Sequence, residues 1–485
     1  MAILVITCWF GISADAATWY VDSAATGAKN GRSWADAWIN VNQITGVLAG
    51  DVVYVSGGPS GQSRTYTLSS AWTPIGGATG NPITYKIGND AQHNGVAIFN
   101  SGPSDFIDGA LNNVVISGDA GDGAMHFQLG AIAIAFFVDG STNLRISYVN
   151  CGNQQRTPFR LDPGTNIEID HCYCNKLTHS EDDCMGVITS TNLPYDRNKI
   201  HDNEFHLPRS STNTVAAGYG DDGWIGKNWS GVSFYRNKVI GYGITNYLAG
   251  QHQDAQQPLG GDHIKCYDNY FENISNYPFY GDAYYAGFTN LYVFNNILVL
   301  TDAVVQGQPS PQGIAIGSEM NNAPFSNIVV ANNLIADYAG HSAINLGDGG
   351  SGTISYGPNV GLYNNIATNN ANADNGHPVF GNQGNANVAN VNNVNLLPLA
   401  TGLGIFVSYT QNHGGTADFH LVASALSLIR KGTNLSANAA QCPEIMFDRD
   451  GKPRPASGAW DIGPYVYGVG RPAAPTGLRV VPNGQ

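Results

Sequence analysis

The sequence predicts an all-β protein, a single-stranded right-handed parallel β-helix in which short coils stack along one axis. Three observations predict this fold. Short segments of alternating apolar and polar residues recur along the chain, each carries an Asn at an equivalent position, and clusters of Gly, Asn and Asp separate them. The copies are spaced by roughly 23 to 37 residues, which is typical of a solenoid.

The chain begins with a predicted targeting segment. An apolar run over residues 3–12 is followed by the small-x-small pattern Ala14-Asp15-Ala16. We therefore expect residues 1–16 to be a signal peptide and the mature protein to be extracellular; a buried first strand is the alternative. No other stretch approaches the roughly 18 consecutive apolar residues of a membrane helix, so no membrane insertion is expected.

A solenoid must cover its apolar ends. Residues 33–47 have the amphipathic pattern of a short helix that begins at a Ser cap, and this capping helix would close the N-terminal end. The segment VVYV at residues 52–55, followed by Ser-Gly-Gly, is then the first strand and turn of the stack.

The repeated segments account for both the core and the turns. Coils stacked about 4.8 Å apart bury a continuous interior and pair their backbone groups with the coils above and below. The recurring Asn occupies one bend of each coil, where its amide either forms a ladder along the stack or only favours the turn. The aligned residues are Asn203, Asn237, Asn269, Asn296, Asn333 and Asn365.

Composition limits the classes of function. Only 12% of the 485 residues are charged and 42% are hydrophobic, so a large core can form beneath a surface of Asn, Ser, Thr and Gly. The formal net charge of −14 and the lack of a basic patch in the sequence argue against a nucleic-acid partner. The cysteines match no zinc pattern, and both a cross-coil disulfide between Cys151 and Cys172 and buried thiols are open.

Segments near both ends resemble a known superfamily. The opening WYVDSAATGAKNGRSWADAW, the segment GNPITYKIG, and the closing DFHLVASALSLIRKGTNL and DRDGKPRPASGAWDIGPYVYG are similar to secreted right-handed parallel β-helix proteins of the pectate-lyase-like superfamily. The resemblance implies one β-helix over residues 17–468 and a polysaccharide lyase or glycoside hydrolase type of protein. Residues 469–485 form a Pro-containing linker, in which PTGLRV resembles the start of a fibronectin type III module.

Acidic residues recur at a nearly fixed offset from the repeated Asn. Asp222 and Asp254 lie fifteen residues before the Asn of their coils, and Asp282 and Glu319 lie fourteen residues before theirs. Equivalent positions on adjacent coils are about 4.8 Å apart, so these carboxylates would form one column on the outer wall. Such spacing suits acid–base catalysis, and mutual repulsion would raise one pKa. Turn formation at coil corners is the alternative role.

Two further polar segments are candidates for the active site. His252, Asp254 and Gln256 alternate along one predicted strand and would share a face, which suits acid–base chemistry and sugar binding. A hydrated surface strand is the alternative. The segment HSEDDCMG resembles the aspartate-pair strand of polygalacturonases, and the resemblance implies a catalytic role for Asp183.

A lyase needs a cation that neutralises the uronate carboxylate and a base that removes the C5 proton. A calcium ion on Asp221, Asp222 and Asp254, with Lys227 or His252 as base, would supply both. No cofactor other than calcium is expected. An ordinary solvated lysine is the alternative for Lys227.

Aromatic and polar residues of the same stretch would bind sugar rings, which stack on aromatic faces. The candidates for substrate binding are Trp224, Gln256, Tyr280, Tyr284 and Glu319. We expect a monomeric extracellular enzyme that cleaves a uronate-containing polysaccharide by β-elimination. A glycoside hydrolase with paired aspartates and a non-catalytic carbohydrate-binding or adhesive protein are the two alternatives.

Overall fold

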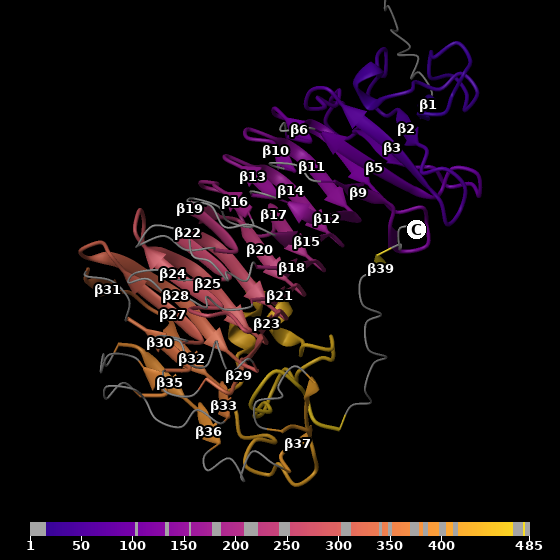
Figure 1. Cartoon of the computed structure of the whole chain (residues 1–485). Coiled ribbons are helices and arrows are strands. Elements are labelled where there is room, and N and C mark those ends of the chain that lie inside the picture. Colours follow the sequence, from indigo (N-terminus) through magenta and orange to yellow (C-terminus); the bar gives the residue numbers. More distant parts are fainter. Residues whose placement is uncertain are drawn as a thin grey trace, which may run out of the picture.

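Three rows of parallel strands wind around one axis and form the expected right-handed parallel β-helix (Figure 1). The computed structural model describes residues 16–468 and 479–480, except for the segments 102–104, 131–134, 155–156, 177–185, 208–221, 242–252, 302–311, 339–341, 348–351, 369–377, 382–386, 397–403 and 411–415. We call the three rows face I, face II and face III, in the order in which each coil visits them.

Each face is defined by its strands. Face I contains β6 (Ile107–Asp108), β10 (Phe136–Phe137), β13 (Phe159–Leu161), β16 (Gly186–Ile188), β19 (Trp224–Ser230), β24 (Phe279–Ala283), β27 (Ile314–Ser318), β30 (Ile344–Leu346) and β34 (Phe380–Gly381). Face II contains β1 (Thr18–Val21), β2 (Val52–Val55), β4 (Ile83–Ile87), β7 (Asn112–Ser117), β11 (Thr142–Ser147), β14 (Thr165–Asp170), β17 (Asn198–His201), β20 (Val232–Tyr235), β25 (Phe288–Phe294), β28 (Ala323–Ala331), β31 (Ile354–Tyr356), β32 (Val360–Tyr363) and β35 (Ala389–Val391). The long strand β22 (Gln256–Tyr267) runs from face I into face II, because its first part pairs with β19 and its second part with β20.

Face III is a separate sheet of twelve strands. Its members are β3 (Ser63–Leu68), β5 (Val96–Ser101), β9 (Phe127–Leu129), β12 (Val149–Gln154), β15 (Tyr173–Lys176), β18 (Glu204–His206), β21 (Lys238–Ile240), β23 (Tyr270–Glu272), β26 (Ile297–Val299), β29 (Leu334–Ala336), β33 (Ile366–Thr368) and β36 (Val394–Leu396). Two small pairs lie outside the faces, β8 (Ala124–Met125) with β39 (Arg479–Val480), and β37 (Phe406–Ser408) with β38 (Asp418–Leu421).

The interior is a continuous apolar column, because alternate residues of every strand point inward. Aromatic rings stack from coil to coil in this column. The ring centroids of Phe136 and Phe159 are 5.4 Å apart, and those of Phe159 and Trp224 are 5.7 Å apart. This burial supplies the main driving force for stacking the coils.

The repeated Asn residues form the amide ladder. Each Asn Nδ2 of the six aligned positions donates to the Oδ1 of the next Asn along the stack, over 2.8–3.2 Å, and the ladder extends to Asn393. The residue before each of the six aligned Asn is left-handed, with φ between 51° and 58°. Both explanations of the Asn column therefore hold: a left-handed turn brings the amide inward, and the ladder satisfies it there.

The predicted capping helix over 33–47 is wrong. The only helical residues in that segment are the 3₁₀ turn η1 (Val41–Gln43). Trp38 lies before it and pairs with β1, since its N–H donates to the Tyr20 carbonyl and its own carbonyl accepts from Asp22 N–H. Trp38 also stacks on Trp19 at 5.3 Å. A backbone that is bridged to a strand cannot also make helical hydrogen bonds, so an irregular loop closes this end.

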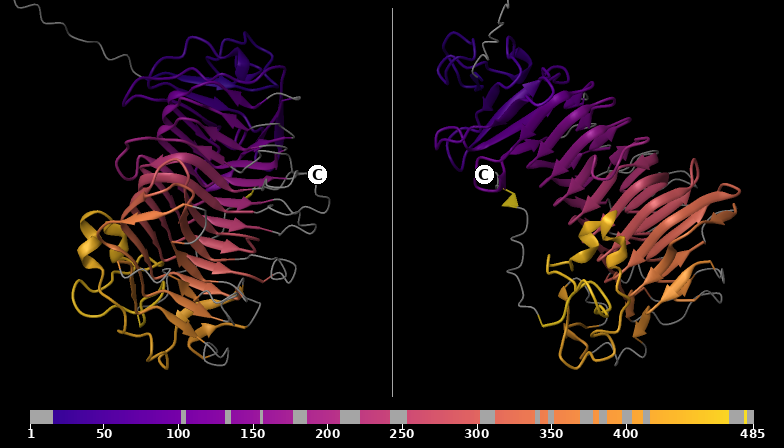
Figure 2. Two further views of the ribbon diagram at one scale, coloured as in Figure 1. Left: turned by 90° about the vertical axis from the view of Figure 1, so that its left-hand side faces the viewer. Right: turned by 180° about the vertical axis from the view of Figure 1, so that it is seen from behind.

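The C-terminal segment packs against face II of the later coils, as the views in Figure 2 show. This segment includes the 3₁₀ turns η4 (Ser436–Ala440) and η5 (Pro443–Met446). Its Glu444 pairs with Lys265 of β22 at 2.9 Å, and its Arg454 donates to Asn295 after β25 at 2.9 Å. Within the described ranges, no helix has the length and apolarity needed to cross a bilayer.

The described cysteines are buried free thiols, including Cys151, Cys172 and Cys174 in the central coils. Cys151 lies in register with Cys174 rather than with Cys172. The thiol alternative therefore describes this structure, and the disulfide between Cys151 and Cys172 is not formed.

Candidate functional site

The first two acids of the predicted column lie on adjacent coils. The register of β19 with β22 places Trp224 opposite Gln256, and therefore Asp222 opposite Asp254. Asp222 Oδ1 accepts the backbone N–H of Asp254 at 2.9 Å. Asp254 Oδ1 accepts from Asn276 Nδ2 at 2.8 Å and from the N–H of Tyr277 at 2.9 Å. Both carboxylates are buried, so they join successive corners of face I.

The single column of four acids is wrong. The N–H of Ala255 donates to the Tyr277 carbonyl, which places Tyr277 at the Asp254 position of the next coil. Asp282 lies further along β24, opposite Gly317, and Glu319 follows the end of β27. The offset from the Asn failed because the chain between faces I and II changes length from coil to coil.

That change in length can be followed in the register. Gly261 and Phe288 occupy equivalent positions on β22 and β25. Five positions separate Gly261 from Gln256, whereas nine separate Phe288 from Phe279, the residue equivalent to Gln256. The extra residues include Tyr284 and form a bend after β24. Counting back from the Asn therefore reaches a different point on the strand.

Asp282, on face I, has a strongly perturbed carboxyl. Its neighbour Gly281 faces inward, because a Cβ there would meet Ile316 and the Phe279 ring, so Asp282 faces the other side. Burial, and then the charge of Glu319, raise the pKa of Asp282 to about 6, although the Glu319 N–H donates to it. Asp282 Oδ1 is buried and has no hydrogen-bond partner among the residues that the structure describes. Such a carboxyl exchanges a proton near neutral pH.

A cation and several tyrosines lie on the same face as Asp282. Lys227 occupies the equivalent position two coils earlier, about 9.6 Å away along the axis. Its Nζ lies 4.5 Å from the ring centroid of the exposed Tyr285, and Tyr284 is exposed next to it. Burial, and then the Asp282 charge, raise the pKa of Tyr280, which therefore stays a neutral hydroxyl. We call Lys227, Tyr280, Asp282, Tyr284, Tyr285 and Glu319 the face I patch.

Two predicted substrate-binding residues belong to the core. Trp224 is 1% exposed and packs between Phe159 and Phe205. Gln256 is fully buried, and its side chain contacts the Cys266 thiol. Both expectations were wrong. Alternate residues of these strands face outward, and in β19 the outward set includes Lys227 and not Trp224. Three other candidates, Asp183, Asp221 and His252, lie outside the described residues.

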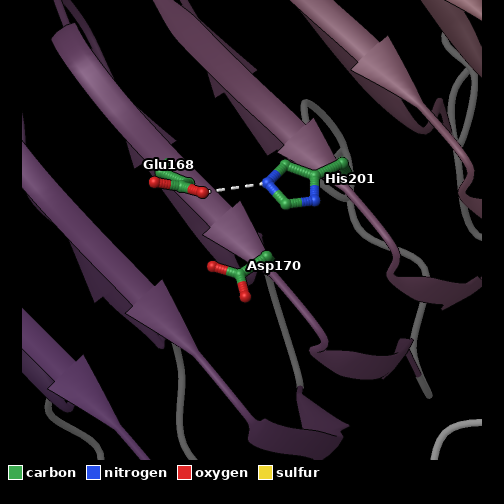
Figure 3. A group of neighbouring side chains, drawn as sticks. All are labelled: Glu168, Asp170 and His201. Carbon is green, nitrogen blue, oxygen red and sulfur yellow. Dashed lines mark hydrogen bonds and ion pairs between the residues drawn. The ribbon is translucent and has the colours of Figure 1, made fainter.

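Sequence reasoning missed a second polar cluster, on face II (Figure 3). Ligand atoms of Glu168, Asp170 and His201 lie within 4.8 Å of one another. His201 Nε2 is 3.0 Å from Glu168, and its Nδ1 is 2.8 Å from Asp202. Burial lowers the pKa of His201, but these two hydrogen bonds outweigh it, and the pKa is raised.

The face II cluster does not fit a metal ion. Arg145 binds Asp170 with two hydrogen bonds, of 2.8 and 2.9 Å. Burial opposes ionisation of Asp170, but its bonds to His171 and Arg145 lower its pKa. A cation at this point would face the Arg145 guanidinium at close range, so the cluster is better described as an ion-paired network.

Comparisons with known proteins found matches among solved structures only, all at low identity. No protein-family model and no curated protein matches the chain. The structure is similar to the pectate lyase Pel9A, with 16% identity, a TM-score of 0.46, and coverage of 93% of this chain and 96% of that one. A rhamnogalacturonan lyase matches with 14% identity, a TM-score of 0.42, and coverage of 88% and 98%.

A third similar structure has another activity. It is the catalytic unit of a GH87 alpha-1,3-glucanase from Streptomyces thermodiastaticus, with 10% identity, a TM-score of 0.43, and coverage of 72% of this chain and 64% of that one. Identities and TM-scores this low carry no argument about what the chain does. The parallel β-helix itself is shown by the strand pairing of this structure.

Proposed function

We propose that this protein is an extracellular enzyme that cleaves a polysaccharide on the face I patch. The observation that carries the proposal is Asp282, a buried carboxyl with a pKa of about 6 and one oxygen without a partner among the described residues. The same patch presents an exposed cation, Lys227, and two exposed rings, Tyr284 and Tyr285. A proton-exchanging group beside aromatic platforms suits chemistry on sugars.

The preferred reaction is β-elimination on a uronate. Above pH 6 Asp282 is mostly ionised and can remove the C5 proton. The C5–H electron pair then forms the C4=C5 double bond, the C4–O bond breaks, and its electron pair leaves on the glycosidic oxygen, which takes a proton from water. Lys227 supports this step, because an ammonium near the uronate carboxylate stabilises the charge that develops beside C5.

The pair of Asp282 and Glu319 favours hydrolysis as the second candidate. Glu319 raises the pKa of Asp282, so one member of the pair can be protonated while the other is ionised. This division between an acid and a base is the one that glycoside hydrolases use. Cleavage would then consume water, and the product would carry a new reducing end without a double bond.

Calcium stays a prediction. Asp222 and Asp254 are adjacent oxygen donors, but each already uses one carboxylate oxygen to accept backbone N–H groups. Calcium takes about six to eight oxygen ligands. The described residues of this corner supply too few carboxylates for a closed site, and Asp221 lies outside them.

The products from a panel of uronate and neutral polymers test the proposal. Unsaturated ends that absorb in the ultraviolet support the lyase, and reducing ends without this absorbance support the hydrolase. Binding without any new ends would overturn the enzyme proposal and leave the carbohydrate-binding alternative. Repeating the assay with a chelator and then with added calcium separates metal use from the residues of the patch.

A further inference from the structure

A groove on face II has no role in the proposed reaction. A cavity of about 250 Å³ lies across β7, β11, β14 and β17, on a different side of the coil from the face I patch. Its polar lining includes Asn143, Arg145, Glu168, Arg197 and Lys199. The C-terminal segment contacts β22 and β25 of face II, further along the stack.

The side chains of this groove follow the coil spacing. Asn113, Asn143 and Asn166 form a second amide ladder at the entry to face II, with Nδ2 to Oδ1 distances of 2.8 and 2.7 Å. The register of β14 with β17 places Arg197 at the next step of this ladder, and it places Lys199 opposite Glu168. A ligand with a regular repeat can therefore meet similar groups on successive coils, about 4.8 Å apart.

The ion pairs within the described part of the groove leave out two of its cations. Glu168 pairs with His201, and Asp196 shares Lys265 at 2.9 Å with Glu444 of the C-terminal segment. Arg145 is compensated by Asp170 at 2.8 Å. These partners leave two cations, Arg197 and Lys199, that form no ion pair with any described residue.

Arg197 and Lys199 both line the groove without an ion-pair partner among the described residues. They point to an anionic ligand. The amide ladder and the Glu168 carboxylate add donors and acceptors of the kind that sugar hydroxyls use. The Arg197 guanidinium and the Lys199 ammonium lie two residues apart on one coil, and each can bind a carboxylate of an extended anionic chain.

We infer that this groove is a second, non-catalytic binding site for a uronate oligosaccharide, held by Arg197 and Lys199. The choice of a uronate rests on the proposed function, but the site itself rests on the two unpaired cations and the amide ladder of face II. The groove would hold the polymer while face I cleaves it, and it would thereby raise the local concentration of substrate.

Calorimetric titration of the full chain with a galacturonate trimer tests the inference. The Asp282→Asn variant serves as the background, so that the ligand is not consumed. Adding Arg197→Gln and Lys199→Gln should raise the Kd of one binding event by about tenfold or more, or remove that event from the titration. The matched control, Lys29→Gln with Lys238→Gln, removes the same charge outside the groove and should bind as the background does.

Neutral and sulfated trimers complete the experiment. Equal binding of the neutral trimer, or unchanged galacturonate binding in the Arg197 and Lys199 variant, would overturn the inference. Loss of sulfated-trimer binding alone would show an anion site of another chemistry and would also overturn it. If no polymer is cleaved but binding still depends on Arg197 and Lys199, the groove stands and the proposed function falls.

Discussion

Asp282→Asn should stabilise the protein at pH 8 and have no such effect at pH 4. The pKa of Asp282 is raised from 3.8 to about 6 in the fold. The folded state therefore binds this proton more tightly than the unfolded chain does. Folding is least favourable above both pKa values, where the carboxyl is ionised in the folded and in the unfolded state. Stability falls as the pH rises from about 4 to about 6, and the cost is then constant.

The shift sets the size of the effect. Two pKa units correspond to about 3 kcal/mol, since one unit is about 1.36 kcal/mol. Asp282 is only 5% exposed, so solvent screens little of this cost. The amide that replaces the carboxyl would remain neutral, and its oxygen can accept the Glu319 N–H as the carboxylate does. The gain at pH 8 should therefore reach about 2–3 kcal/mol.

Urea unfolding of both proteins at pH 4, 6 and 8 measures this difference. Glu319→Gln is the matched control, because it removes the neighbouring charge and should lower the pKa of Asp282 without removing its carboxyl. A gain that is the same at pH 4 and pH 8, or a variant that is less stable at pH 8, would refute the assignment of a strained ionised carboxylate to Asp282.

Three other substitutions test separate parts of the structure. Asn269→Ala removes four ladder hydrogen bonds, which join Asn269 to Asn237, Phe234 and Asn296. The free energy of unfolding in urea should fall by about 3–5 kcal/mol, and a fall below about 1 kcal/mol would show that the ladder is not stabilising. Lys227→Gln should lower kcat/KM on a uronate polymer by about 100-fold or more, with an unchanged melting temperature, and a neutral polymer should show no such loss. Asp222→Asn with Asp254→Asn should leave both the activity and the melting transition nearly intact, because neither residue belongs to the face I patch and each amide oxygen can still accept its backbone N–H; loss of activity in a folded variant would place these corners in the site.

The sequence predicted the features that recur in every coil, but it did not predict those that differ from coil to coil, such as the end cap and the loop lengths. The six aligned Asn and the strand at 52–55 were predictable, because a ladder and a β-helix strand each follow from local pattern. The capping helix was not, since the bridge between Trp38 and Val21 joins segments that local periodicity treats separately.

The candidate site failed in part for the same reason. Asp282 was predicted as an acid of the outer wall, but its position relative to Asp254 was predicted wrongly. The bend after β24 is longer than the matching part of the previous coil, so counting back from the Asn misplaces it. Alternate residues of a strand face inward, and the local sequence does not show which set does. The inward direction of Trp224 and Gln256 therefore could not be predicted. The face II groups had a visible signal: aligning the strands on the Asn also aligns Arg145, Glu168 and Lys199 at one outward position.

In the proposed reaction, Asp282 performs the chemistry on face I. The most direct measurement is the initial rate of polymer cleavage against pH, for the wild type and for Asp282→Asn. We expect a wild-type rate that changes with a half-point near pH 6, and a variant that has lost about 100-fold or more of that rate. A variant that cleaves at the wild-type rate, with the same dependence on pH, would contradict it.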